Sequence, residues 1–302
     1  MGLDNTVAVV TGSGQGLGLA YAKDLARHGA AVVVNDIDRT TAEAAVSSIR
    51  EAGGRAVAVV APVGSADTAD ELVATAVDNF GRLDVMVTNA GILRDKVLWK
   101  MTDDDFDSVV NVHLRGTFTC ARAAAVHFRA QGDGGRIVCI GSPAGQRGNF
   151  GQTNYSASKA GIVGMVRTWA MELKRAGVTV NAVCPVAATS MTESVPFLQR
   201  YIDAMRHGEE LPPFARRELG FGTPIDAAGI VSFLASDAGA EITGQAFAVG
   251  GDRLAVWTHP DMTATSYHDG GWAAEDIAAA WASTFADSLQ SVGENIPTEP
   301  TS

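Results

Sequence analysis

The chain alternates short apolar runs with longer segments of helical periodicity for most of its length. The apolar runs are rich in valine and end at glycine or at a polar residue, as strands buried on both faces of a sheet do. The segments between them predict helices, of which Asp103–Gln131 and Tyr155–Ala176 are the longest. Without an internal repeat, this alternation predicts an α/β fold, a doubly wound Rossmann-type parallel sheet with helices on both faces. Seven strands are predicted, at Thr6–Thr11, Ala31–Asn35, Ala56–Val60, Leu83–Val87, Arg136–Ile140, Thr179–Val183 and Ala246–Val249.

The same pattern predicts one domain and a tail. We expect a single dinucleotide-binding catalytic domain over residues 1–254. Within it, residues 186–223 form a connection with three prolines that is too long for a plain loop, which is typical of a substrate lid. A C-terminal tail follows over residues 255–302, with one amphipathic candidate helix at Ala273–Leu289 and a polar end that contains Pro297 and Pro300.

Charge and composition exclude several classes of protein. The formal net charge of −11 argues against a nucleic-acid partner or an anionic membrane partner, since both need basic patches. An anionic cofactor stays possible, because amides at a helix N-terminus bind phosphate without basic side chains. The three cysteines, Cys120, Cys139 and Cys184, are too scattered for a disulfide framework or a metal cluster and are interpreted as buried apolar residues. With no apolar stretch of about 20 residues and no secretory leader pattern, a cytoplasmic protein is expected.

A glycine-rich segment, TGSGQGLG at Thr11–Gly18, joins the first predicted strand to the first predicted helix. Glycines at such a turn let the backbone approach a pyrophosphate, while the helix N-terminus supplies amide donors and its dipole. A glycine-rich turn alone is weak evidence. Here it follows a strand, opens a helix and has an acidic residue at a suitable distance downstream, so a nucleotide-binding loop is predicted.

The acidic residue is Asp36, at the end of the second predicted strand. Its carboxylate can accept hydrogen bonds from the adenosine ribose hydroxyls and would repel a 2′-phosphate. The loop itself contains no lysine or arginine to receive such a phosphate, so we predict NAD in preference to NADP. Arg39 argues the other way, because it lies close enough to be recruited by a phosphate, and a plain turn or N-cap role for Asp36 is the alternative.

Of the four tyrosines, only Tyr155 is followed by a lysine four residues later, Lys159. At the start of a helix this spacing places both side chains on one face. A free phenol has a pKa near ~10, too high for a base at neutral pH. A nearby ammonium, together with an oxidised nicotinamide, stabilises the phenolate and makes proton transfer possible. The pair therefore predicts acid–base chemistry on an alcohol or ketone.

Two further polar residues are candidates for the same site. Ser142 follows the fifth predicted strand, where its hydroxyl can hydrogen-bond a reacting carbonyl oxygen. Asn111 lies within the preceding long helix and could hold a water in a proton path to Lys159. Each alone would be taken for an ordinary turn or helix residue, so their assignment depends on the whole pattern.

Together these residues resemble the short-chain dehydrogenase/reductase family. The matching motifs, in the order and spacing of the family over residues 6 to about 250, are TGSGQGLG at Thr11–Gly18, Asn89-Ala90-Gly91, Asn111, Ser142, YSASK at Tyr155–Lys159, and Cys184-Pro185 followed by Thr189. The resemblance implies hydride transfer between a nicotinamide and a carbinol carbon, without a metal. It also implies dimers or tetramers formed through helices 103–131 and 155–176.

Residue roles follow from the resemblance. Tyr155 would be the general acid/base, Ser142 would position the carbonyl, Lys159 would bind ribose and act electrostatically, and Asn111 would hold the water. The implied cofactor-binding residues are Gly12, Gln15, Gly16, Leu17, Gly18, Asp36, Val63, Asn89, Ala90, Gly91, Tyr155, Lys159, Pro185 and Thr189.

Three positions depart from the family pattern. Pro62 stands where an aspartate often contacts the adenine, so adenine recognition must differ. Thr88 replaces a frequent asparagine, and Val186 replaces a glycine on the nicotinamide side.

Four segments, Gly91–Asp95, Val112–Gly116, Gly148–Gln152 and Pro185–Thr192, are similar to the branch that includes the 3-hydroxyacyl-CoA dehydrogenase part of peroxisomal multifunctional enzymes and bacterial relatives. This similarity favours a 3-hydroxyacyl-CoA or a related lipid- or steroid-derived hydroxy compound as substrate. A 3-oxoacyl carrier-protein reductase and a dehydrogenase of a free cyclic or steroid alcohol are alternatives, and a non-catalytic cofactor-binding scaffold is a third. The candidate cations for CoA phosphates are Arg94, Lys96, Lys100, Arg147, Arg200 and Arg206, and the apolar lid residues are Met191, Phe197, Leu198 and Met205.

Overall fold

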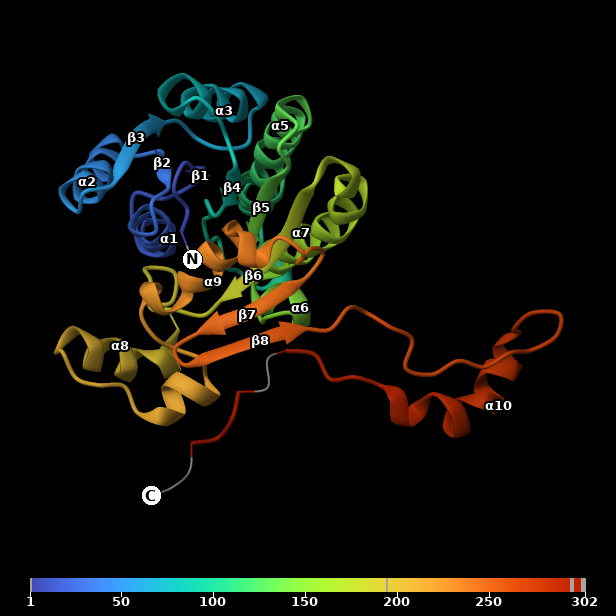
Figure 1. The fold of residues 1–302 in the computed structure, drawn as a ribbon. Helices are drawn as coiled ribbons and strands as arrows, with labels where there is room; N and C mark the ends of the chain where they lie inside the picture. Colours follow the sequence, from blue (N-terminus) through green and yellow to red (C-terminus); the bar gives the residue numbers. More distant parts are fainter. Residues whose placement is uncertain (1, 194, 294–295, 300–302) are drawn as a thin grey trace.

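The computed structural model describes residues 2–193, 195–293 and 296–299 (Figure 1). Its centre is one sheet with the strand order β3-β2-β1-β4-β5-β6-β7-β8. The first seven strands pair in parallel, which confirms the predicted doubly wound sheet. The order reverses between β1 and β4, and the carboxyl ends of strands at such a point form a crevice. The strands are β1 Val7–Val10, β2 Ala31–Asp36, β3 Arg55–Val60, β4 Val85–Thr88, β5 Gly135–Ile140, β6 Val178–Pro185, β7 Ala246–Gly250 and β8 Arg253–Trp257.

The eighth strand is an addition to the seven predicted. β8 pairs antiparallel with β7, with Gly250 opposite Arg253 across a tight turn. Gly251 has φ +51°, and a Cβ there would lie 2.4 Å from the Arg216 carbonyl oxygen, so the turn requires glycine. β8 spans the predicted domain boundary at residue 254. It was missed because it is an edge strand with three exposed central residues, unlike the buried strands that the pattern detects.

Two layers of helices cover the sheet. Alternate residues of one strand face opposite layers: Ala8 and Val10 of β1 pack with α1, α2 and α9, whereas Val7 and Val9 pack with α3, α5 and α7. Within the first layer, the Ser232 hydroxyl of α9 donates a hydrogen bond to the buried Asp24 carboxylate of α1, 208 residues earlier. The helices are α1 Gly16–Arg27, α2 Arg39–Glu51, α3 Ala66–Phe80, α4 Asp103–Val110, α5 Gly116–Gln131, α6 Pro143–Arg147, α7 Thr153–Glu172, α8 Gln199–Arg206, α9 Gly229–Ala235 and α10 Ala274–Thr284.

The segment predicted as one helix, Asp103–Gln131, contains an interruption. A π-helical turn, Asn111–Arg115, joins α4 to α5. Such turns widen the helix by one residue and rotate the side chains that follow. This turn lies beside the cavity described below.

The lid and the tail complete the fold. Residues 186–223 include α8 and enclose a small apolar core of their own around Tyr201 and Phe221, so this lid is packed rather than open.

The tail begins after β8, and its helix α10 has no buried residue. Figure 1 shows α10 extending away from the body of the protein. The chain then returns, where the Gly293 amide donates to the Arg147 carbonyl (2.8 Å). Pro300 and the two residues after it lie outside the described residues.

No described helix has both the length and the apolar character needed to cross a bilayer.

Candidate active site

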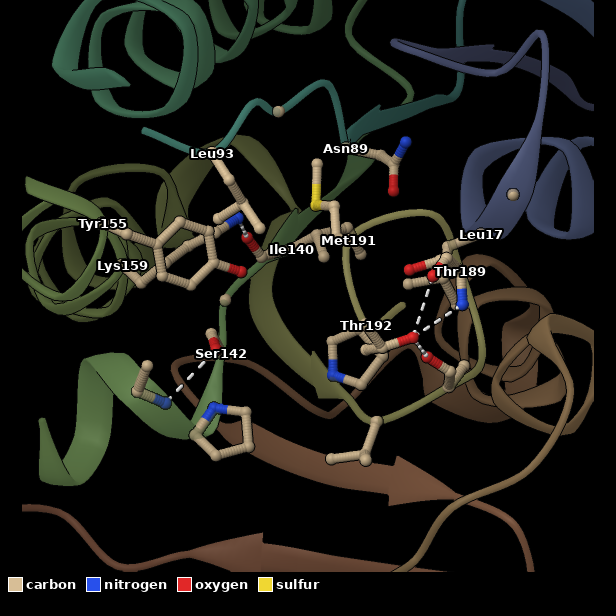
Figure 2. Close-up of a pocket in the computed structure, with 18 of the residues that line it drawn as sticks. Leu17, Asn89, Leu93, Ile140, Ser142, Tyr155, Lys159, Thr189, Met191 and Thr192 are labelled. Atoms are coloured by element: carbon tan, nitrogen blue, oxygen red, sulfur yellow. Dashed lines mark hydrogen bonds between the residues drawn. The ribbon is translucent and has the colours of Figure 1, made fainter. Parts of the chain in front are cut away.

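A cavity of about 1250 Å³ opens at the carboxyl ends of β1, β4, β5 and β6. Figure 2 shows Tyr155, Lys159 and Ser142 grouped at one side of it, and Leu17 and Thr189 at the other. The lid and the returning tail add apolar walls. All fourteen residues predicted to contact a cofactor line this one cavity, although they come from segments up to 177 residues apart, since Gly12 is the first and Thr189 the last.

The glycine-rich loop is shaped by close backbone approach. Gly12 has φ +59°, and a Cβ there would lie 2.7 Å from the Ala90 Cα. At Gly18 a Cβ would lie 2.2 Å from the Gly12 carbonyl oxygen. Helix α1 starts at Gly16, and the side chain of the preceding residue, Gln15, makes no capping hydrogen bond. The first amides of α1 therefore stay available at the cavity wall, and this cradle fits a pyrophosphate.

The segment Asn89–Gly91, the second one predicted to contact a cofactor, is joined to the glycine-rich loop by four hydrogen bonds. The Thr11 hydroxyl accepts from the amides of Asn89 (2.9 Å) and Ala90 (3.1 Å). The Asn89 side-chain amide donates to the carbonyls of Thr11 and Gly12, both at 2.9 Å. These bonds hold the glycine-rich loop and the segment Asn89–Gly91 together in the cavity wall.

Asp36 lies at the end of β2 with its side chain in the cavity wall. Its carboxylate accepts hydrogen bonds from the amides of Gly14 (3.0 Å) and Asp38 (3.1 Å). These bonds fix the side chain, and each oxygen can still accept another. The fixed carboxylate fits the hydroxyls of a ribose.

Lys159 is buried one helical turn after Tyr155 on α7. Its Nζ donates to the Ile140 carbonyl at the end of β5 (2.6 Å) and lies 5.5 Å from the centroid of the Tyr155 ring. Burial lowers the pKa of this lysine to about 8. Because this pKa is only slightly above neutral, most of the amine is still protonated at pH 7.

Burial raises the pKa of Tyr155 to about 12, and the hydrogen bond with Ser142 acts in the opposite direction. The neutral phenol is thus the stable form, so Tyr155 is suited to donate a proton, and its phenolate requires positive charge beside it. The Ser142 hydroxyl also accepts from the Ala144 amide (3.2 Å), which caps the short helix α6 and fixes the serine after β5.

Asn111 is not brought to this group. It is exposed on the π-helical turn, and its side chain lies against Gly64, where a Cβ would come within 2.9 Å of the Asn111 amide nitrogen. The Asn111 side chain thus lies outside the cavity wall that contains Lys159, and its role in holding a water stays a prediction. The residue that lines the cavity instead is His113, two positions later. The helical spacing of the buried residues Val109, His113 and Cys120 could have identified it, since Asn111 falls off that face.

The cations considered for CoA phosphates are mostly engaged elsewhere. Lys96 pairs with Asp105 (2.7 Å), Arg206 with Glu193 (2.7 Å) and Arg200 with Glu299. Arg94 and Lys100 are exposed outside the cavity wall. Arg147 is the one of the six in the cavity wall, and it donates to the carbonyls of Gly293 (2.7 Å) and Ser291 (3.0 Å).

The apolar lid residues divide into two groups. Met191, Phe197 and Leu198 line the cavity, whereas Met205 packs against the core of the lid. Pro62 also lines the cavity, beside Ala61 and Val63, and the three residues present an apolar surface to it.

Known proteins resemble the chain over nearly its full length. The family profile described as short chain dehydrogenase matches residues 6–197. A 3-oxoacyl-[acyl-carrier-protein] reductase of Synechocystis is 45% identical over 82% of this chain and 96% of its own. A hydroxyacyl-CoA dehydrogenase of Mycobacterium tuberculosis is 39% identical over 94% of this chain and 90% of its own. The crystal structure of a short chain dehydrogenase from Mycobacterium avium has a TM-score of 0.81 at 34% identity, covering 96% of this chain and 98% of that one.

Proposed function

The chain belongs to the short-chain dehydrogenase/reductase family and is thus an oxidoreductase of hydroxyl and keto groups with a nicotinamide cofactor, and from this premise we propose that it is an NAD-dependent dehydrogenase of 3-hydroxyacyl-CoA compounds. The observation that carries the proposal is the single cavity that joins Asp36, the glycine-rich loop and the Tyr155–Lys159 pair to an apolar lid.

The proposed chemistry is proton transfer by Tyr155. A bound nicotinamide supplies or accepts the hydride at the carbinol carbon. In the reductive direction Tyr155 gives its phenolic proton to the carbonyl oxygen while the Ser142 hydroxyl holds that oxygen by a hydrogen bond. The Lys159 ammonium, 5.5 Å from the ring, stabilises the phenolate that is left. In the oxidative direction the same phenolate takes the proton of the alcohol.

We propose NAD rather than NADP on account of Asp36. Its carboxylate is held by the Gly14 and Asp38 amides, so it cannot swing away from a 2′-phosphate without breaking both bonds. Arg39, the nearby cation, pairs with Glu43 (3.2 Å) on α2, which draws it away from the ribose end.

The acyl-CoA class is supported by two features. The lid adds Met191, Phe197 and Leu198 to the wall of the same cavity, an apolar surface that suits an acyl chain. The M. tuberculosis relative, named a hydroxyacyl-CoA dehydrogenase, shares the tail as well as the core, since the match covers 94% of this chain. The acyl carrier-protein reductase is the second candidate, favoured by the higher identity of the Synechocystis protein, whose match covers a smaller share of this chain, 82%.

We further propose a cytoplasmic homodimer or homotetramer that pairs α4–α5 and α7 with their copies. These helices carry exposed apolar side chains that a subunit contact would cover: Phe106, Phe118, Val126 and Met171. Sedimentation of the purified chain tests this assembly, and a monomer at micromolar concentration would refute it.

The test of function compares kcat/KM for 3-hydroxyacyl-CoAs of several chain lengths, a carrier-protein-linked substrate, and free cyclic and steroid alcohols, each with NAD and NADP. Tyr155→Phe is the inactive control. The proposal predicts the highest kcat/KM for an acyl-CoA with NAD. A preference for the carrier-linked substrate or for a free alcohol would overturn the substrate class. Bound NAD without turnover of any compound would indicate a cofactor-binding scaffold.

A further inference from the structure

His113 is a buried imidazole in the wall of the reaction cavity, only 2% exposed. It lies in the middle of the π-helical turn Asn111–Arg115. Burial, and then the charge of Lys159, lower the pKa of His113 to about 3. The ring is therefore neutral over the working pH range, and it does not add a second positive charge beside the lysine.

One ring nitrogen of His113 contacts the backbone of the opposite wall. Nε2 lies 2.8 Å from the Ile92 carbonyl oxygen and 3.0 Å from the Ile92 amide nitrogen. A neutral imidazole serves one of these groups in each tautomer, donating to the carbonyl or accepting from the amide. His113 is thereby connected to the segment that directly follows Asn89–Gly91.

The same ring also fills the space between this wall and Tyr155. Its plane is at 88° to the Tyr155 ring, with centroids 5.1 Å apart, an edge-to-face contact. On its other side, a Cβ at Gly91 would lie 2.3 Å from the imidazole Cε1. The imidazole thus occupies the volume that a side chain at position 91 would need, and it is in contact with both the tyrosine and the cavity wall.

We propose that His113 is a positioning residue that fixes the Tyr155 ring relative to the Gly91–Leu93 wall. It acts through two contacts, the Nε2 bond to Ile92 and the face-to-edge packing on Tyr155. The inference rests on the proposed function only in that Tyr155 is taken as the proton-transferring group. Since a displacement of about 1 Å can cost on the order of 100-fold in rate, a group that holds the phenol in place should be visible in kcat.

Three substitutions at position 113 test the hydrogen bond between Nε2 and Ile92. His113→Leu keeps much of the ring volume and removes the bond to Ile92. His113→Gln can place a polar atom near the Nε2 position, whereas His113→Asn is too short to reach it and ends near Nδ1. His127→Leu is the matched control, because His127 lies on α5 outside the cavity wall and its side chain hydrogen-bonds to Gln131.

The expected result is a fall in kcat of about 10–100-fold for His113→Leu and His113→Asn, with NADH affinity changed less than about threefold. His113→Gln should regain most of the lost rate, and His127→Leu should retain wild-type kcat. Wild-type kcat in His113→Leu would overturn the proposal, as would rescue by asparagine and not by glutamine. If leucine at 113 prevents folding, the contrast between glutamine and asparagine still decides.

A second measurement needs no substrate. Nitrogen-15 NMR of histidine-labelled protein should show the His113 imidazole neutral down to pH 5, with Nε2 hydrogen-bonded. A titration of this ring near pH 6–7 would overturn the proposed placement. If wild type reduces a simple ketone but no acyl-CoA, the proposed substrate is wrong, and the kinetic comparison at position 113 is carried out on that ketone.

Discussion

Asp36→Asn should change the cofactor preference of the enzyme without disturbing its fold. Asparagine has the shape of aspartate, and its carbonyl oxygen can still accept the hydrogen bond that the Gly14 amide gives to Asp36 at 3.0 Å. The glycine-rich loop is therefore retained. The substitution removes one negative charge from the cavity wall, and the Nδ2 that replaces the other oxygen gives up the hydrogen bond from the exposed Asp38 amide (3.1 Å).

The magnitude follows from two contributions. A hydrogen bond to a charged group is worth about 1.5–3 kcal/mol and a neutral one about 0.5–1.5 kcal/mol, so the ribose bond should weaken by about 1–1.5 kcal/mol. Two unit charges about 4 Å apart in water repel by about 1 kcal/mol, and a 2′-phosphate carries nearly two charges, so about 2 kcal/mol of repulsion is removed. Together, about 3 kcal/mol corresponds to a fall of about 100-fold in the NAD/NADP ratio of kcat/KM.

The assay measures kcat/KM with NAD and with NADP under identical ionic strength, for wild type, Asp36→Asn and Asp38→Asn. Asp38 is the matched control, since it lies two residues away and its exposed carboxylate caps α2 through the Thr41 amide (2.8 Å). Its substitution should shift the ratio less than about threefold, because its charge is screened by solvent. If Asp36→Asn leaves the ratio within twofold, or if both variants shift it equally, the ribose assignment is refuted.

Three further outcomes are expected. Tyr155→Phe should lower kcat by at least ~100-fold while NADH affinity, measured by fluorescence, stays within about threefold; activity above a few per cent would contradict the acid role. The kcat/KM of ketone reduction should fall as pH rises through about 8, because the Lys159 ammonium is present below that pKa and absent above it. The flanking thiols do not titrate in this range, since burial raises the pKa of Cys139 to about 12 and that of Cys184 to about 11. A kcat/KM that rises with pH would contradict this role of Lys159. Arg147→Ala removes the side-chain bonds to Ser291 and Gly293 and keeps the backbone bond from the Gly293 amide, so limited proteolysis near residue 290 should accelerate several-fold. Unchanged cleavage would show that the side-chain bonds do not hold the tail.

The parallel sheet could be predicted because its strands are buried on both faces and therefore read as continuous apolar runs. β8 could not, since Leu254 and Val256 are exposed and the strand is recognised only by its pairing with β7. The helices predicted at Asp103–Gln131 and Tyr155–Ala176 start and end within four residues of the observed ones, whereas the tail helix predicted at Ala273–Leu289 ends at Thr284. The π-helical turn has no sequence signature comparable to a capping residue.

The candidate site was predictable to the extent that its motifs lie at strand ends. Asp36 ends β2 and Ser142 comes two residues after β5, and parallel strands bring their carboxyl ends to one edge. Asn111 lies inside a helix, where the direction of a side chain depends on local helix geometry. The partners of Arg147 and Arg200 come from the tail about 100 to 150 residues later, a relation that charge spacing along the chain does not contain.

The bond between Asp24 and Ser232 has a consequence for how the protein is made. Ribosomes add about 5–20 residues per second, so the partner of Asp24 is synthesised roughly 10–40 seconds after it. Until then α1, whose first turn lines the cavity, lacks the helix α9 that covers its buried carboxylate. A nascent chain that ends before residue 229 therefore lacks the helix that covers this face of α1, and the layer of α1, α2 and α9 is completed only when nearly the whole domain has been synthesised.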